Sequence, residues 1–210
     1  MLIPADKIVA ILQSYNINID GVFHIGAHDC EELSFYNTLG VAKEQVLWID
    51  AVENKVEDAR NRNIPNVYQA VITDRDDDNI TFHISNNIQS SSILELGTHL
   101  YEHPDVYYNT HVQLKSITVD TFFEKNGLDA SHYSFWNFDI QGAELLALKG
   151  AVKSIQHAKA LYLEVNEREL YKKCGLIHEI DAFLATYGFV RVITSMTQHG
   201  WGDALYVLSA

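Results

Sequence analysis

The stretch VFHIGAHDCEELSFY at residues 22–36, followed by VLWIDA at residues 46–51, decides the fold. Residues 22–25 are a short apolar run that predicts a buried strand ending at Gly26. The residues after it predict a helix over 31–39, and the second apolar run predicts a strand that ends at Asp50. A strand, a helix and a strand in this order favour parallel strands joined by a crossover helix.

The same alternation continues along the chain on both sides of this unit. Further strands are expected at 67–71, 134–138, 160–163, 189–193 and 204–208, with an antiparallel addition at 80–84. Further helices are expected at 54–62, 119–125, 143–148 and 177–186. No helix fits in the loop between the last two strands, which carries Trp201 and Gly202, so these strands should form an antiparallel pair. The sequence therefore predicts an α/β fold with a mostly parallel sheet and helices on both faces.

The length of 210 residues suits one domain, with residues 1–20 as an N-terminal helical extension. Residues 86–111 are rich in Asn, Ser, His and Tyr and show no period. A long irregular stretch inside a compact domain is often functional, and we interpret it as a lid or substrate-binding loop. An ordinary surface excursion fits the same pattern equally well.

The composition excludes several classes of protein. With 28 acidic and 15 basic residues the formal charge is −13, which disfavours a nucleic-acid partner. No apolar run is long enough to span a bilayer, and the N-terminus lacks the features of a signal peptide, so a cytoplasmic location is the default. Cys30 and Cys174 alone give neither a disulfide framework nor a zinc site, and they fit a reducing compartment.

Acidic residues follow the predicted strands. In open α/β sheets, ligands bind beyond the carboxyl ends of the strands. The residues at those ends are Gly26, Asp50, Val71, Asp139 and Glu164. One carboxylate could be a helix cap, but three at one edge indicate a site, because buried unpaired charge is costly.

The first turn and the second strand end indicate an adenosine-type ligand. Gly26 lets a ligand approach the backbone, and Asp29 either caps the next helix or accepts from an ammonium group. An acid at the position of Asp50 typically accepts hydrogen bonds from ribose hydroxyls. The turn has a single glycine where a pyrophosphate needs three, and none of the eleven tyrosines begins a Tyr-x-x-x-Lys pair. S-adenosylmethionine, which has no pyrophosphate and carries an amino group and a sulfonium, fits better.

Five segments in order resemble the FkbM-type methyltransferases. They are VFHIGAHDCEELSFY with VLWIDA, SITVDTFFEKNGL (116–128), FWNFDIQGAELLALKGA (135–151), LYLEVNERELY (161–171) and GDALYVL (202–208). The most specific is FWNFDIQGAELLALKGA, which is similar to the family's Asp-x-x-Gly-x-Glu segment and the Lys-Gly after it. The resemblance covers about residues 20 to 208.

The resemblance implies a class I methyltransferase (Rossmann-like) seven-stranded sheet whose last strand is antiparallel. It also implies methylation of hydroxyls, often on sugars or polyketide-type metabolites, with S-adenosylmethionine as cofactor. The implied cofactor-binding residues are Gly26, Ala27, His28, Asp29, Asp50, Ala51, Ala70, Val71 and Asp139. The sequence departs from the family pattern at four places. His24 stands where an acid is common, His28 where Asn is common and Cys30 where Gly is common. Asp50 with Ala51 stands where Glu-Pro is common.

A hydroxyl is a weak nucleophile, so a general base should assist the transfer. Asp139 is our first choice and Glu164 the second, although Asp139 could instead only orient the cofactor or cap a helix. The residues expected to face the small-molecule or glycan acceptor are Ser91, Gln141, Glu144 and Trp201. Trp201 would join Tyr101, Tyr107 and Tyr108 in a sugar-stacking wall, although such aromatic residues are more often packing.

A divalent metal is the other route to an activated hydroxyl, and we favour it less. Asp139 and Glu164 offer oxygen ligands, while His99 and His103 have i, i+4 spacing but no third ligand nearby in sequence. Two rival functions stay open: a nucleotide-dependent oxidoreductase, and a non-catalytic binding module that has kept the fold.

Overall fold

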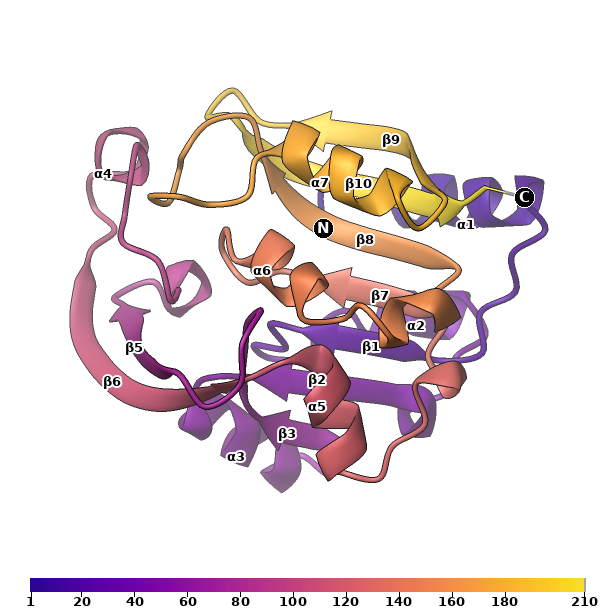
Figure 1. Ribbon diagram of the computed structural model, residues 1–210, viewed down its shortest axis with the longest axis horizontal. Coiled ribbons are helices and arrows are strands. Elements are labelled where there is room, and N and C mark those ends of the chain that lie inside the picture. Colours follow the sequence, from indigo (N-terminus) through magenta and orange to yellow (C-terminus); the bar gives the residue numbers. More distant parts are fainter. Residues whose placement is uncertain (210) are drawn as a thin grey trace.

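The computed structural model describes residues 1–209, and a seven-stranded sheet forms its centre (Figure 1). The order of its strands is β3-β2-β1-β7-β8-β10-β9. Their bounds are β1 Val22–Ile25, β2 Val46–Asp50, β3 Val67–Gln69, β7 Phe135–Phe138, β8 Ala160–Asn166, β9 Phe189–Met196 and β10 Trp201–Leu208. Strand β10 runs antiparallel to both β8 and β9, while the other neighbours are parallel. The predicted fold class, including the antiparallel closing pair, is confirmed.

Helices cover both faces of this sheet (Figure 1). One face carries α1 (Ala5–Ser14), α2 (Leu33–Thr38) and α3 (Glu53–Asn61). The other carries α5 (Val119–Lys125), α6 (Glu144–Lys149) and α7 (Ile177–Ala185). Shorter helical turns are α4 (His99–Glu102), η1 (Lys43–Gln45), η2 (Ile88–Ser90), η3 (Ala130–His132) and η4 (Ser154–His157). No helix within residues 1–209 combines the length and apolarity needed to cross a membrane.

The central strands are apolar on both sides because each face packs on helices. Along β2, Val46 and Trp48 belong to the core under α1–α3, and Leu47 and Ile49 belong to the core under α5–α7. Successive side chains of a strand point to opposite faces, so a sheet buried twice needs continuous apolar runs. This is why the sequence predicted these strands well.

A second sheet of three strands stands beside the first, at the left of Figure 1. It contains β4 (Val71–Ile72), β5 (Asn79–Ser85) and β6 (Tyr108–Ile117), with β5 antiparallel and β4 parallel to β6. The predicted strand 67–71 is therefore two strands in different sheets, and β6 was missed. Most of β6 is exposed and polar, so it lacks the apolar run that marks a buried strand. The irregular segment predicted over 86–111 ends at residue 107.

Two sequence expectations about strand ends are wrong. Glu164 lies inside β8 rather than after it, and Trp201 and Gly202 begin β10 rather than forming the preceding loop. The reason is pairing, because Trp201 faces Asn166 and Asp203 faces Glu164 across the two strands. The partner strand extends both strands into polar residues that no apolar pattern would include.

Candidate active site

Two adjoining cavities open at the carboxyl edge of the main sheet, where β1, β2, β7 and β8 end. The space of the first cavity, counted with the solvent at its open mouth, is about 610 Å³. The second encloses about 1200 Å³. The residues that line both are Gly26, His28, Gln89, Asp139 and Gln141. The two spaces therefore meet at the turns that follow β1 and β7.

The first cavity has mainly apolar walls, and one carboxylate lines it besides Asp139 at the junction. Ala51, Ala70 and Val71, all predicted near an adenine, line it together with Ile72 and Phe82. Ser91, predicted to face the acceptor, lines this first cavity instead of the second.

The carboxylate in this cavity is that of Asp50, and it is fixed from two sides. Its Oδ2 accepts the backbone N–H of His28 at 2.7 Å, and its Oδ1 accepts that of Val52 at 2.8 Å. Burial raises the pKa of Asp50, although both backbone N–H groups favour the ionised form. Each carboxylate oxygen has a second lone pair, so both remain able to accept from the hydroxyls of a ligand.

The turn after β1 requires glycine. Gly26 has φ +95°, and a Cβ built on it would overlap the carbonyl oxygen of Asp139. The backbones that leave β1 and β7 therefore touch at the junction of the two cavities. A side chain at position 26 would separate them.

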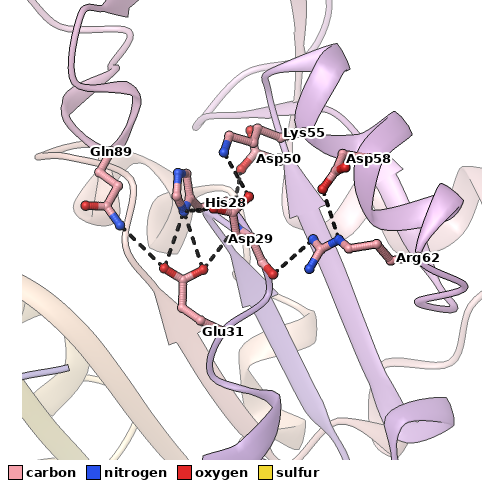
Figure 2. A network of polar contacts seen from close by, with 8 residues as sticks. All are labelled: His28, Asp29, Glu31, Asp50, Lys55, Asp58, Arg62 and Gln89. Atoms are coloured by element: carbon pink, nitrogen blue, oxygen red, sulfur yellow. Dashed lines mark hydrogen bonds and ion pairs between the residues drawn. The ribbon is translucent and has the colours of Figure 1, made fainter.

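A polar network holds the rest of this turn in place (Figure 2). His28, in the left-handed region at φ +41°, has its Nδ1 3.3 Å from Glu31. Asp29 accepts from Lys55 Nζ at 2.8 Å, and its carbonyl accepts from Arg62. Ala27 is buried, and neither it nor Asp29 lines a cavity, in contrast to the predicted cofactor contacts. Asp29 serves the turn through its ion pair instead.

His24, the residue that departs from the family pattern in β1, is part of the core. Its Nδ1 is 2.8 Å from the hydroxyl of Tyr36, which also accepts from Asn137 Nδ2 at 2.7 Å. Burial lowers the pKa of His24 to about 4, so the ring is neutral near pH 7. It fills a polar position in the sheet and faces neither cavity.

Three carboxylates lie side by side on adjacent strands at the second cavity. Asp139 follows β7, whose last residue pairs with the residue before Glu164, and Glu164 pairs with Asp203 of β10. Asp203 was not predicted from the sequence, because Asp203 lies near the start of β10 and not after a strand. An antiparallel strand begins where its parallel neighbours end, so the start of β10 belongs to the same edge.

Gln141 joins two of these carboxylates. Its Nε2 donates to Asp139 Oδ1 at 2.7 Å and to Glu164 Oε2 at 2.8 Å, and its Oε1 accepts from the Tyr171 hydroxyl at 2.6 Å. Its φ is +56°, an uncommon value for a residue other than glycine. Gln141 lines both cavities, yet its amide is occupied by protein partners, so it positions the carboxylates.

Burial and mutual repulsion favour the protonated forms of these acids. The pKa of Asp139 is raised by burial and then by the charge of Asp203. The pKa of Glu164 is raised well above its usual range by burial and then by Asp139. A carboxyl with a raised pKa is a better proton acceptor near neutral pH than an ordinary one.

The side chain of Glu144 is fully buried and lines neither cavity. The structure therefore does not support the predicted contact of Glu144 with the acceptor. Its Oε1 accepts the backbone N–H of Ile140 at 2.8 Å and that of Gly142 at 3.3 Å. Burial raises its pKa to about 8. Glu144 shapes the turn that presents Asp139 and Gln141.

Of the four aromatic residues predicted to stack on a sugar, one lines the second cavity. Trp201 lines the second cavity, whereas Tyr101 is 85% exposed and Tyr107 is 56% exposed. The hydroxyl of Tyr108 donates to the Leu94 carbonyl at 2.6 Å, which fixes its ring outside both cavities. His99, considered above as a metal ligand, lines the second cavity with His103.

Metal-ligating geometry occurs in one place among residues 1–209. The group is His28, Asp29 and Glu31, whose ligand atoms lie within 4.8 Å of one another. The ammonium of Lys55 already binds Asp29 there. Neither Asp139 with Glu164 nor His99 with His103 belongs to such a group of three.

Comparison with known proteins gives a family and a set of similar structures. A sequence model described as "Methyltransferase FkbM domain" matches residues 24–191. No curated protein sequence matches.

The similar structures are all distant in sequence. Magnesium protoporphyrin IX methyltransferase (ChlM) from Synechocystis PCC 6803 with bound SAM has 15% identity and a TM-score of 0.47, over 98% of this chain and 78% of that one. A SAM-dependent methyltransferase from Bacteroides fragilis with S-adenosyl-L-homocysteine has 7% identity and a TM-score of 0.47, over 100% and 79% of the two chains. One from Aquifex aeolicus has 13% identity and a TM-score of 0.41, over 99% and 91%.

Proposed function

Because this chain belongs to the FkbM-domain methyltransferase family and is an S-adenosylmethionine-dependent methyltransferase, we propose that it methylates a hydroxyl group of a sugar or glycan, with Asp139 as the general base. The observation that carries the proposal is the position of Asp139, which lines both cavities at their junction.

The first cavity fits the cofactor. Its apolar walls at Ala51, Val71 and Phe82 suit an adenine, and the fixed carboxylate of Asp50 suits the two ribose hydroxyls. The methionine part would then extend past Gly26, where the absent side chain leaves the backbone open to a ligand. This orientation directs the reactive end of the cofactor toward Asp139 and the second cavity.

The reaction at the junction is an in-line displacement. When bound, S-adenosylmethionine supplies a methyl group activated by its positively charged sulfur. The acceptor oxygen forms a bond to the methyl carbon while the carbon–sulfur bond breaks, and the electron pair of that bond stays on sulfur. The hydroxyl proton passes to Asp139. Positioning of the acceptor supplies much of the rate, and the base supplies a further part.

The neighbours of Asp139 suit it to this role. Gln141 holds Asp139 Oδ1 at 2.7 Å, which leaves Oδ2 to receive the proton. Burial raises the pKa of Glu164 well above its usual range, which favours its protonated, neutral form beside Asp139. We assign Glu164 to positioning through Gln141 and keep Asp139 as the catalytic base.

The acceptor occupies the second cavity in this proposal. Its walls offer carboxylates, amides, Ser90 and the indole of Trp201, a mixture suited to a polyhydroxylated ligand. Residues 86–107 form part of both cavities through Gln89, and we propose that they act as a lid over cofactor and acceptor.

The Asp139→Asn variant tests the base. Because a general base contributes about 10²- to 10⁴-fold, turnover should fall by at least about 100-fold. Affinity for S-adenosylhomocysteine should stay within about threefold of the unchanged protein, because uncharged Asn keeps the size of the side chain. Methyl transfer to a panel of mono- and oligosaccharides is followed by mass spectrometry, and affinity by calorimetry.

The matched control is Asp120→Asn, because Asp120 caps residues 153 and 154 far from the cavities. Its turnover should equal that of the unchanged protein. Full turnover by Asp139→Asn would disprove the base assignment. Methylation of amines alone, with every hydroxyl acceptor inert, would disprove O-methylation.

A further inference from the structure

The second cavity is unusually acidic. Five carboxylates line it: Glu31, Glu32, Asp139, Glu164 and Asp203. No lysine or arginine is among its lining residues. The amino group of Met1 lies at its margin and acts on Glu32, so positive charge from the described residues is small beside the negative charge.

The nearby cations are already engaged elsewhere. Lys55 binds Asp29 at 2.8 Å, Arg62 binds Asp58 at 2.9 Å, and Arg168 lies 3.5 Å from Glu102 (Figure 2 shows the first two pairs). The carboxylates of the cavity instead raise one another's pKa, as Asp203 does for Asp139 and Asp139 does for Glu164. A row of like charges on adjacent strands is destabilising, and either protonation or a bound cation relieves it.

Two polar groups in the same cavity lack partners, and they indicate a ligand independently of the charges. His99 is 4% exposed and lines the cavity, and its Nδ1 is buried with no hydrogen-bond partner among the described residues. The indole Nε1 of Trp201, also in the lining, is a buried donor with no acceptor. Orphaned buried polar atoms are costly, so a ligand that satisfies them gains affinity.

A divalent ion needs several ligand atoms close around one point. His28 and Glu31 of the lining form such a group only with Asp29, which Lys55 already binds, and the other lining carboxylates form none. An organic cation can span separated carboxylates and present hydroxyls to other groups at the same time. The cofactor carries one net positive charge when bound, and no lysine or arginine of the lining adds to it, so the carboxylates that stay ionised are not balanced by side chains of the cavity.

We propose that the acceptor is an amino sugar, whose ammonium group binds near Glu32 and Asp203 while its hydroxyls bind His99 and Trp201. The inference rests on the proposed function, since it names the acceptor class of the same site. Neutral His99 accepts a hydrogen bond from a hydroxyl, the indole of Trp201 donates one, and the Trp201 ring packs on the sugar face. A second hydroxyl then reaches Asp139, where the methyl group is transferred.

The test measures binding of matched sugars to the protein saturated with S-adenosylhomocysteine. Glucosamine, galactosamine and mannosamine are each compared with the N-acetyl sugar, which lacks the positive charge, by ligand-detected NMR at slightly acidic pH. At least one amino sugar should bind about tenfold or more tightly than its N-acetyl counterpart, because hydrogen bonds to charged groups are stronger than neutral ones.

The Glu32→Gln variant locates the ammonium group. The Glu32 side chain bonds only to its own backbone N–H and to no other described residue, so the variant should fold normally and reduce the preference at least about threefold. Glu124→Gln, the same change at an exposed residue of α5, should leave the preference unchanged.

Equal binding of the charged and neutral sugars, binding of neither, or binding that needs added Mn²⁺ would overturn the inference. So would an unchanged preference in Glu32→Gln. Titration of the same protein with S-adenosylhomocysteine separates the two proposals. Lost cofactor binding refutes the site as a whole, whereas intact cofactor binding without amine preference refutes only the acceptor class.

Discussion

Gly26 shows how much one residue decides at this site. Its missing side chain allows the backbone after β1 to contact the carbonyl of Asp139, and its φ of +95° is in the left-handed region. Two separate costs would therefore follow from a side chain at this position, one from the backbone conformation and one from the overlap. At another glycine of this sequence, a side chain would strain the backbone conformation but would overlap no other atom.

That glycine, Gly40, makes a controlled comparison possible. It has φ +80°, but a Cβ there would meet nothing within 4 Å. Gly40→Ala should lower the free energy of unfolding by about 1–2 kcal/mol and leave the affinity for S-adenosylhomocysteine unchanged. Gly26→Ala should cost more stability and abolish measurable binding. Thermal melts and calorimetry give the two quantities, and equal effects of both substitutions would show that overlap with Asp139 is unimportant.

The carboxylate of Asp50 is held in one position by the protein itself. Its two oxygens accept the N–H groups of His28 and Val52, so the carboxylate is held in place before any ligand binds. Preorganised acceptors bind hydroxyls without a further ordering cost.

The Asp50→Asn variant should bind S-adenosylhomocysteine about 10- to 100-fold more weakly, because hydrogen bonds to charged groups are worth about 1.5–3 kcal/mol each. Asp58→Asn in α3, which loses only an exposed ion pair with Arg62, should bind normally. Calorimetry measures both dissociation constants. An affinity of Asp50→Asn equal to that of the unchanged protein would remove Asp50 from the cofactor site.

At the scale of elements, the turn between β7 and α6 depends on a buried acid. Glu144 begins α6 and accepts two backbone N–H groups of the preceding turn, so it connects helix and turn. The same turn presents Asp139 to the cavities and Gln141 to Glu164. A side chain that faces neither cavity therefore shapes both.

Glu144 should make stability depend on pH in a defined direction. Burial raises its pKa from 4.5 to about 8, so the folded protein retains a proton that the unfolded chain has lost. This contribution to stability is fully present below pH 4.5 and is lost as the pH rises through about 8. Glu144→Gln cannot ionise, so its Tm relative to the unchanged protein should increase as the pH rises across that interval.

Calorimetric melts at several pH values measure this difference. Glu124→Gln, at an exposed site on α5, provides the baseline and should show the same pH dependence as the unchanged protein. A constant difference between Glu144→Gln and the unchanged protein at all pH values would mean that folding does not change the pKa of Glu144.

For the whole molecule, the second sheet and residues 86–107 stand over the carboxyl edge of the main sheet (Figure 1). Residues 94–99 are anchored, because Leu94 and Leu96 pack in an apolar cluster with Leu170, Tyr171 and Cys174, and Gly97 N donates to the Leu170 carbonyl at 2.8 Å. Residues 86–93 belong to no apolar cluster and are held by polar contacts such as Gln89 Nε2 to Glu31 at 3.4 Å. Segments held by few buried contacts open at low free energy, which suits a lid.

We expect cofactor binding to order this segment. Ile88, Gln89, Ser91 and Ile93 line the first cavity, so S-adenosylhomocysteine should slow amide hydrogen exchange over residues 86–93. Exchange in β9, which lines neither cavity, should not change and serves as the internal reference. Mass spectrometry of peptic fragments measures both regions. Equal exchange of residues 86–93 with and without ligand would contradict the lid.

Much of the fold follows from local pattern. Strands that are buried on both faces are continuous apolar runs in the sequence, as at residues 46–49. Most strands of the main sheet were therefore predicted. Strand β6 was missed because its partners, rather than an apolar face, make it a strand. The contact of Asp29 with Lys55 and the burial of Glu144 could not be predicted, because a motif gives the identity of a residue but not the direction of its side chain.

Motifs of the sequence alone indicated the family by resemblance. The hydrophobic period and the order of elements along the chain predicted the wound sheet and the edge at which its acidic residues gather, because both are read from neighbouring residues. Only the tertiary structure decided which of those residues meet. In the folded chain Asp203 lies beside Glu164 and near Asp139, Asp29 binds Lys55, and Glu144 is buried beneath the turn. The physical reason is that strand pairing and burial, which join residues far apart in the chain, fix both the neighbours and the charge of each carboxylate.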